Sequence, residues 1–408
     1  MSLNDTEISR TAAELRTNLE LSGLSPSEAA ADLLISETEL SALLTARDVD
    51  PASVWQLRDY LEQAVFDAGQ RPAPFTVLTE DNRRKAAGWF TLRDAPRHDF
   101  GQPAASPSAR PRPGGTFDLG SRSVARIGYG AMQLERLRED RATGISLIRR
   151  AVELGIDHID TAQFYGNGLS NELIHEALSP GDEVAIVSKV GAAPDPGGPF
   201  PMRAAQRPEE LRAEVEANLR TLGIEQLAVV NLRRMDTGVT IPMPDDQVVS
   251  IEDQLAEMVA MRDEGLIGGI GMSNTTIDGL RTALPAGIDC VQNAYSLIAR
   301  GDDDMLELCE AEGIAWVPFF PLGSGFEGMP KVTDEENVIR VAAELGATPS
   351  QVGLAWLLDR APNVLLIPGT ASVDHLGANV EVGELTLTES QRALLDEIPT
   401  SEPGTIRP

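Results

Sequence analysis

Four polar residues in the C-terminal two-thirds of the sequence have the types and spacing needed for proton transfer. They are Asp160, Tyr165, Lys189 and Arg233, and three of them end an apolar run that is typical of a strand. A carboxylate, a phenol and two cations, brought together at one opening, can deliver a proton to a carbonyl group that is being reduced. The fold must therefore bring several separate strand ends to one place.

Strand and helix patterns alternate eight times after residue 116. The expected strands are Ile127–Met132, Ile156–Asp160, Val184–Lys189, Leu227–Leu232, Gly268–Met272, Asp289–Gln292, Ala315–Pro318 and Val364–Ile367. Helical patterns fall between them, for example at Thr143–Leu154, Pro208–Leu222 and Ile251–Glu264. This alternation predicts an α/β fold of the (β/α)8 TIM-barrel type. An open doubly wound sheet is the alternative, but Gly128 and Gly130 give only G-x-G, without the third glycine of its phosphate-binding turn.

Side-chain alternation predicts what faces the barrel interior. On the expected fourth strand Asn231 and Arg233 share one face, and on the third strand Lys189 falls on the inner face. The working residues of such barrels project from the C-terminal ends of the strands. Because a buried ammonium needs a partner, we expect Lys189 to pair with Asp160.

Composition predicts a soluble protein of two domains. The chain has 408 residues, of which 42% are apolar and 24% charged. A proline-rich stretch, 96–115, is the expected linker between an N-terminal helical domain (1–95) and the barrel (116–408). No signal or transmembrane pattern is evident. Cys290 and Cys309 lack the spacing of a redox or metal pair, so we expect a reducing cytoplasm and no metal.

The first domain has helical patterns at 8–19, 26–34, 37–44 and 54–65, with Ser25 and Ser36 as N-caps. This order resembles an all-α, helix-turn-helix-like DNA reader. However, the expected reading helix offers Glu37 and Glu39 to the bases, and the whole chain has a net charge of −29. Nucleic acid is therefore disfavoured as a partner. A docking or regulatory module, acting through a protein partner or self-association of residues 1–95, is favoured.

Several motifs carry a family resemblance. In chain order they are HIDTAQFYG at 158–166, VSKVG at 187–191, GMSN at 271–274, VQN at 291–293, PFFPLGSG at 318–325 and IPGTASVDHLGAN at 367–379. From Phe117 onward the sequence resembles the aldo-keto reductases, and FDLGSRSVARIGYGAMQL, VVNLR, PFFPLG and IPGT are most similar to their bacterial pyridoxal reductase branch. Residues 1–95 resemble a small uncharacterised bacterial family.

The resemblance implies a role for each of the four polar residues. Tyr165 is the general acid that gives its proton to the carbonyl oxygen, Lys189 supplies positive charge beside the phenol, and Asp160 holds the lysine. Arg233 stands where most aldo-keto reductases have histidine; it can donate to the substrate oxygen but cannot transfer a proton. Two alternatives stay open. In the first, Arg233 merely binds Asp236. In the second, His158 takes the place of the missing histidine, although a packed, hydrogen-bonded role in the barrel interior is favoured.

The resemblance also implies the residues that bind NADP(H). Ser273, Asn274 and Gln292 hold the nicotinamide carboxamide, and Phe319 stacks on the ring. Further contacts come from the ends of the first, seventh and eighth strands and the following helix: Gly130, Met132, Pro321, Leu322, Gly323, Ser324, Pro368, Gly369, Thr370, Ser372, His375 and Asn379. The family's usual lysine and arginine for the 2′-phosphate fall at Gly369 and His375, which leaves NAD(H) as an alternative cofactor.

Three functional hypotheses follow. The first is an NADPH-dependent oxidoreductase that reduces a small, pyridoxal-like aldehyde or ketone to the alcohol. The alternative is a nicotinamide-sensing regulatory protein with little turnover that signals through the N-terminal helices, suggested by the replaced histidine and the added domain. The third is a cofactor-gated DNA binder, against which the acidic charge argues.

Overall fold

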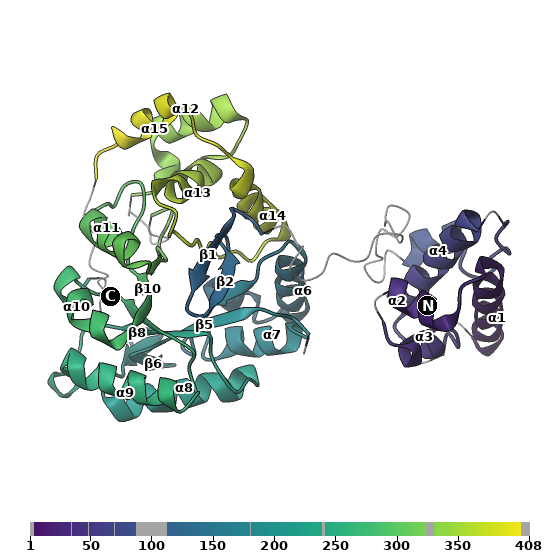
Figure 1. Ribbon diagram of the computed structural model, residues 1–408, viewed down its shortest axis with the longest axis horizontal. Coiled ribbons are helices and arrows are strands. Elements are labelled where there is room, and N and C mark those ends of the chain that lie inside the picture. The colour runs from purple at the N-terminus through teal and green to yellow at the C-terminus, as the bar shows by residue number, and fades with distance from the viewer. Residues whose placement is uncertain are drawn as a thin grey trace. The chain divides into compact units, whose positions relative to one another are not determined.

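The computed structural model describes residues 4–86 and 112–400, apart from residues 34, 48, 69, 180, 239–240 and 324–329. Contacts divide the chain into two compact units, Met1–Ala109 and Arg110–Pro408 (Figure 1). Most of the expected linker, residues 96–111, lies outside the described residues.

The N-terminal unit is helical. Its helices are α1 (Asp5–Ser22), α2 (Pro26–Asp32), α3 (Glu37–Leu43), α4 (Pro51–Asp67) and α5 (Glu80–Ala86). Ser25 and Ser36 precede α2 and α3 as expected, and each hydroxyl accepts a hydrogen bond from the main-chain N–H three residues later. Buried side chains such as Leu15, Leu40 and Leu61, from α1, α3 and α4, form a separate core.

Parallel strands of the second unit form one sheet. In spatial order they are β11 (Ala315–Trp316), β10 (Ile288–Gln292), β9 (Ile270–Ser273), β8 (Val229–Arg233), β5 (Ala185–Val190), β4 (His158–Asp160) and β3 (Tyr129–Gly130). All neighbouring strands pair in parallel. Since the spatial order follows the chain order, each strand is linked to the next by a helical crossover, as in a βα barrel.

Residues 364–369 take the place of the eighth strand and close the barrel. Val364 bridges Trp316 of β11, and Leu366 bridges Ile127 just before β3 on the other side. Main-chain hydrogen bonds of 2.8 Å flank both bridges. The predicted barrel is therefore confirmed, and the alternative of an open sheet is wrong.

A hairpin covers the N-terminal ends of the barrel strands. Its strands are β1 (Thr116–Leu119) and β2 (Arg122–Ala125), which pair antiparallel. Leu119 and Val124 of the hairpin pack against inward-facing residues of the barrel such as Val229, whereas Val230 belongs to the core between strands and helices. The predicted alternation is correct, and it leaves the other end of the barrel for polar side chains.

Helices pack around the outside of the sheet. They are α6 (Arg141–Glu153), α7 (Leu169–Ala177), α8 (Pro208–Leu222), α9 (Ile251–Asp263), α10 (Ile277–Ala283), α11 (Asp303–Glu312), α12 (Glu336–Leu345), α13 (Pro349–Arg360), α14 (Val373–Glu381) and α15 (Glu389–Asp396). The last of them, α15, lies against α12. Helix α8 has the predicted bounds because Pro208 fits the first turn and Gly223, with φ of 65°, ends it in the left-handed conformation.

Several elements differ from the prediction, among them α5 and the β1–β2 hairpin, neither of which was predicted. Residues after β3 form a 3-10 helix, η3 (Ala131–Leu137), so the first strand ends at Gly130 rather than Met132. A second hairpin, β6 (Ala192–Pro194) and β7 (Met202–Ala204), follows β5 and was not predicted. Within the described ranges, no helix is both long and apolar enough to cross a bilayer.

Candidate active site

Asp160 and Lys189 form a buried ion pair at the ends of β4 and β5. The Lys189 ammonium donates to Asp160 Oδ1 and, at 3.1 Å, to the carbonyl oxygen of Thr161. The second carboxylate oxygen accepts from Gln292 Nε2 at 2.6 Å. Burial alone lowers the pKa of Lys189, but the charge of Asp160 and the phenol of Tyr165 more than offset it, so its pKa is raised. The lysine therefore stays protonated.

The loop after β4 brings Tyr165 to this pair. Its main-chain N–H donates to Ala162 O at 3.1 Å, and the next three residues, Gly166, Asn167 and Gly168, all have positive φ before α7 begins. This reversal turns the phenol over the strand ends. The Lys189 ammonium lies 4.9 Å from the centroid of its ring.

Arg233 ends β8 and lies close to the same phenol. Burial lowers the pKa of its guanidinium, and the nearby Tyr165 opposes that shift. Its Cζ lies 5.5 Å from the centroid of Phe319, a cation–π distance. Asp236 pairs with the next residue, Arg234, at 3.0 and 2.5 Å. The alternative in which Arg233 binds Asp236 is therefore wrong.

His158 lies inside the barrel, one inward position before Asp160. Its ring is 1% exposed, and within the described residues neither ring nitrogen has a hydrogen-bond partner. The ring occupies the space over Gly128, where any Cβ would collide with it. The packed role is correct, but the expected hydrogen bond is not present.

Ser273 and Gln292 bring unused polar atoms to the same end of the barrel. Ser273 Oγ and Gln292 Oε1 are buried and have no hydrogen-bond partner within the described residues. A hydroxyl and an amide oxygen in this state fit a carboxamide, which donates and accepts at once. Asn274 differs, because its amide already donates to the carbonyl oxygens of Arg234, at 2.9 Å, and Thr237.

The segment after β11 places the next expected contacts. Phe319 N donates to Asn293 O at 3.0 Å, which fixes the phenyl ring beside Arg233. Pro321 and Gly323 bridge each other, and Gly323 has φ of 87°. The side chain of Leu322 is partly buried and packs against the core. The expected contact Ser324 lies outside the described residues.

The end of the eighth strand supplies the remaining contacts. Pro368 and Gly369 lie beside β3, where Gly369 bridges Gly130. Thr370 Oγ1 accepts from Ser372 N at 3.0 Å, and the Ser372 hydroxyl caps the first turn of α14. On the adjoining surfaces His375 and Met132 are exposed and Asn379 is half-buried.

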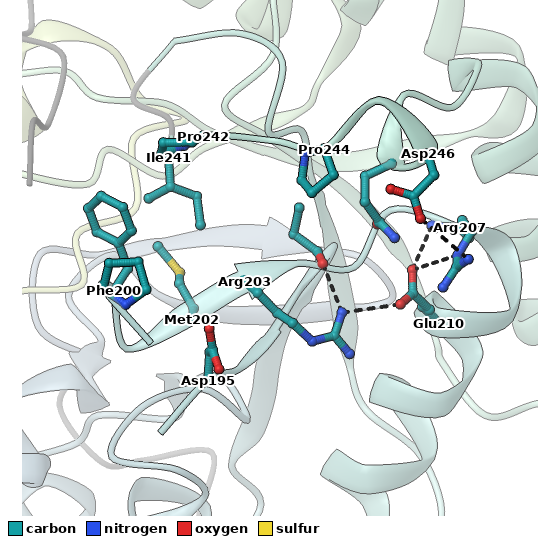
Figure 2. A pocket seen from close by; sticks show the side chains of 13 residues that line it. Asp195, Phe200, Met202, Arg203, Arg207, Glu210, Ile241, Pro242, Pro244 and Asp246 are labelled. Carbon is teal, nitrogen blue, oxygen red and sulfur yellow. Dashed lines mark hydrogen bonds and ion pairs between the residues drawn. The ribbon is translucent and has the colours of Figure 1, made fainter. Parts of the chain in front are cut away.

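A pocket at the β6–β7 hairpin was not predicted from the sequence. It has a volume of about 410 Å³ and lies between the β6–β7 hairpin, the start of α8 and the segment 241–247 (Figure 2). Phe200, Met202 and Ile241 line it and belong to one apolar cluster with Tyr165. Arg203 and Glu210 face each other across its polar side at 3.2 Å. The signal was PDPGGPFPM at 194–202, a turn-rich stretch between two short strands.

Comparison with known proteins agrees with this geometry. Residues 126–399 match the model of the aldo/keto reductase family. The chain is 45% identical over 290 residues to pyridoxine 4-dehydrogenase of Escherichia coli K12, covering 69% of this chain and 98% of that protein. The chain belongs to the aldo/keto reductase family. Residues 1–91 match a second family, described as uncharacterized proteins conserved in bacteria (DUF2316).

A second relative and a solved structure agree with membership of the aldo/keto reductase family. It is 35% identical to an uncharacterized oxidoreductase of Schizosaccharomyces pombe, with 73% of this chain and 94% of that protein covered. An aldo-keto reductase of Klebsiella pneumoniae, solved in complex with NADPH, has the same fold, with a TM-score of 0.58 and 24% identity over 70% of this chain and 96% of that one. The chain is accordingly an oxidoreductase.

Proposed function

We propose that this chain catalyses the NADPH-dependent reduction of a small, pyridoxal-like aldehyde or ketone to the alcohol. The observation that carries the proposal is the convergence of the Tyr165 phenol, the Lys189 ammonium and the Arg233 guanidinium at one end of the barrel. A phenol between two cations is suited to release its proton, because each cation stabilises the phenolate that remains.

Each residue then has a separate task. Tyr165 donates its proton to the carbonyl oxygen, and Lys189 stabilises the phenolate while Asp160 holds the ammonium in place. Arg233 donates a hydrogen bond to the same oxygen as negative charge develops on it. Arginine remains protonated throughout, so Tyr165 is the proton donor and Arg233 stabilises charge.

The cofactor is assigned from the fit of the polar residues. NADPH, when bound, supplies the hydride. Ser273 Oγ and Gln292 Oε1 suit the carboxamide, while Thr370, Ser372 and the first turn of α14 suit a phosphate. The Klebsiella enzyme bound to NADPH supports NADPH, whereas Gly369 and His375 offer no permanent cation to a 2′-phosphate. A direct comparison with NADH is therefore part of the test.

The substrate class rests on the pocket and on the Escherichia coli relative. Phe200, Met202 and Ile241 line the pocket and share an apolar cluster with Tyr165, which is not itself among the lining residues. Apolar side chains of this kind suit a flat ring. The relative's name, pyridoxine 4-dehydrogenase, supports an aldehyde of the pyridoxal kind.

The domain organisation and the setting belong to the same proposal. We assign residues 1–95 to a helical domain for a protein partner or self-association, 96–115 to a linker, and 116–408 to the catalytic barrel. Cys290 and Cys309 are buried free thiols, which suits the reducing cytoplasm.

The test is a matched pair of tyrosine variants. With pyridoxal as substrate, the purified chain should oxidise NADPH faster than NADH. The Tyr165→Phe variant should lower the rate of NADPH oxidation by on the order of 10³-fold. Tyr295→Phe is the control, because Tyr295 is a buried tyrosine whose hydroxyl contacts Asp303 on α11. Turnover of Tyr165→Phe at the parent rate would overturn the proposed mechanism.

A further inference from the structure

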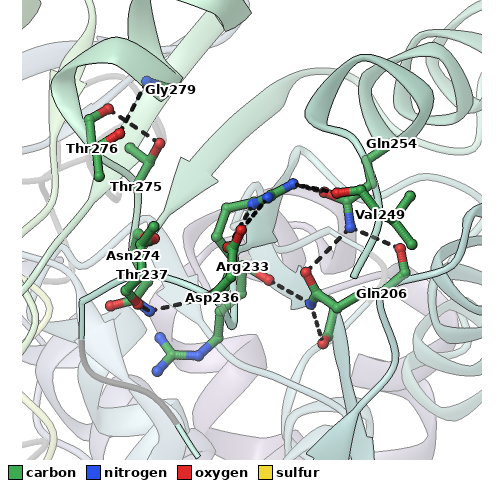
Figure 3. A network of polar contacts seen from close by, with 12 residues as sticks. Gln206, Arg233, Asp236, Thr237, Val249, Gln254, Asn274, Thr275, Thr276 and Gly279 are labelled. Carbon is green, nitrogen blue, oxygen red and sulfur yellow. Dashed lines mark hydrogen bonds and ion pairs between the residues drawn. The ribbon is translucent and has the colours of Figure 1, made fainter. Parts of the chain in front are cut away.

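A glutamine joins the strands that carry Lys189 and Arg233. The ladder between β5 and β8 runs as far as Val190 and Leu232. One residue later, Gln206 Nε2 donates to both carbonyl oxygens, Gly191 O at 2.5 Å and Arg233 O at 2.9 Å (Figure 3). The side chain thus adds one more pair of hydrogen bonds where main-chain pairing between the strands has ended.

Hydrogen bonds to the main chain of Gln206 hold this residue in place. Its main-chain N–H donates to Gln247 Oε1 at 2.6 Å, and Gln254 Nε2 donates to its main-chain oxygen at 2.7 Å. Gln254 Oε1 in turn accepts from Arg234 Nη1 at 2.6 Å. Gln206 is 2% exposed and Gln254 is fully buried. A buried network in which these groups are satisfied allows little movement.

The backbone at Gly191 shows how closely the two strand ends approach. Gly191 has φ of 101°, and a Cβ there would collide with the Arg233 carbonyl oxygen and lie 2.7 Å from Gln206 Nε2. Only glycine permits this approach. The distance between the two strand ends therefore depends on Gly191 and Gln206 together.

We infer that Gln206 is a positioning residue that sets the separation of Lys189 and Arg233 around the Tyr165 phenol. Its kinetic consequences rest on the proposed function. The charged groups that face the phenol are Lys189 on β5, with Asp160 behind it on β4, and Arg233 on β8; the residues that form a cluster with the ring are apolar. Separating β5 from β8 moves Arg233 away and weakens the stabilisation of the phenolate.

The first measurement needs no turnover. It compares crystal structures of the parent and of Gln206→Met. Without the two hydrogen bonds of Gln206, the distance between Lys189 Nζ and Arg233 Cζ should increase by at least about 0.5 Å, which is the tolerance within which catalytic groups must be held.

The second measurement is kinetic. In Gln206→Met, kcat should fall by about tenfold or more while KM for NADPH changes less than threefold, because the cofactor contacts are untouched. Gln206→Glu keeps the volume but cannot donate to two carbonyl oxygens, and Gly191→Ala disturbs the same approach from the other strand. Both should change the distance between Lys189 and Arg233 and kcat in the same direction, and either replaces Gln206→Met if that variant does not fold.

The control is Asn363→Leu at the opposite end of the barrel. Asn363 is fully buried and its Nδ2 donates to Ile314 O at 2.9 Å. This variant should lose stability without changing the distance between Lys189 and Arg233. A Gln206 variant with the parent's distance and turnover, or an Asn363→Leu that changes both equally, would overturn the inference. If the parent has no reductase activity the proposed function fails, but the measured distance still decides the role of Gln206.

Discussion

Each of the two units buries a carboxylate against at least one cation, but the surroundings of the two carboxylates differ. In the N-terminal unit Asp59 accepts from Arg58 at 2.8 Å and from Arg83. In the barrel Asp160 accepts from Lys189 and Gln292. The arginines of the first unit are covered by aromatic rings, Arg83 lying 4.9 Å from the centroid of Trp55. Lys189 instead lies beside a phenol that can ionise.

The comparison shows that a buried ion pair is not by itself evidence of catalysis. The cluster of Asp59 lies among core residues of a helical unit and is suited to fixing α4 against α5. The pair of Asp160 and Lys189 lies where several strand ends meet, next to Ser273 and Gln292 atoms that have no partner within the described residues. Variants of the Asp59 cluster should therefore lose stability, whereas variants of the Asp160–Lys189 pair should lose activity as well.

The largest effect is expected for Lys189→Met. Without the ammonium the Tyr165 phenolate loses a neighbouring cation, so kcat for carbonyl reduction should fall on the order of 10³-fold. The variant also leaves the Asp160 carboxylate buried without a cation, which costs about 3 kcal/mol of the free energy of unfolding. Steady-state kinetics and urea unfolding measure the two effects.

A double variant separates these effects. Asp160→Asn with Lys189→Met removes both charges, while the asparagine oxygen can still accept from Gln292. Stability should return most of the way to that of the parent and activity should not. Recovery of both would mean that the ammonium has only a structural role.

Next in size is Asp59→Asn in the helical unit. Two guanidinium groups lose the carboxylate between them, so the free energy of unfolding of the N-terminal unit should fall by about 3 kcal/mol. Hydrogen exchange of residues 4–86 in the intact chain reports this loss. We expect kcat to stay within twofold of the parent, and a tenfold fall would instead connect the helical unit to catalysis.

The smallest effect concerns Glu214 on α8. Burial raises its pKa to about 7 from the usual 4.5, with Arg203 opposing the shift. Between these two pH values the folded state binds more protons than the unfolded state, so this group's contribution to stability falls as pH rises. Because the group is partly exposed, Glu214→Gln should be about 1 kcal/mol more stable than the parent above pH 7. Below pH 4.5 the two should agree.

The matched control is Glu216→Gln on the exposed side of the same helix, where the carboxylate lies 3.6 Å from Arg220. It should show no such pH dependence. Equal behaviour of the two variants in thermal melts from pH 4 to 9 would argue against the burial of Glu214.

Much of the fold followed from the sequence. Repeated strand and helix periods predicted the barrel, and the cap residues Pro208 and Gly223 gave α8 its bounds. The β6–β7 hairpin was missed because three-residue strands separated by proline and glycine have too little period to stand out. The predicted first strand was too long because the residues after Gly130 form a 3-10 helix, which apolar content alone does not indicate.

The sequence predicted individual residues of the candidate site but not the hydrogen bonds that link the surrounding segments. Lys189 and Asp160 pair as their inward positions predicted. The alternative that pairs Arg233 with Asp236 was wrong. Strand alternation points Arg233 toward the barrel interior, and its neighbour Arg234 is the residue that pairs with Asp236. The role of Gln206 depends on hydrogen bonds between segments that are 15 and 27 residues apart. No local pattern marks such bonds.

The hairpin of Leu119 and Val124 turns the barrel into a cup rather than a tube. Apolar side chains fill its base. Under the proposed function, substrate and product therefore both pass through the end of the barrel that carries Asp160, Lys189 and Arg233, and slow release of the product would limit turnover even when the chemical step is fast.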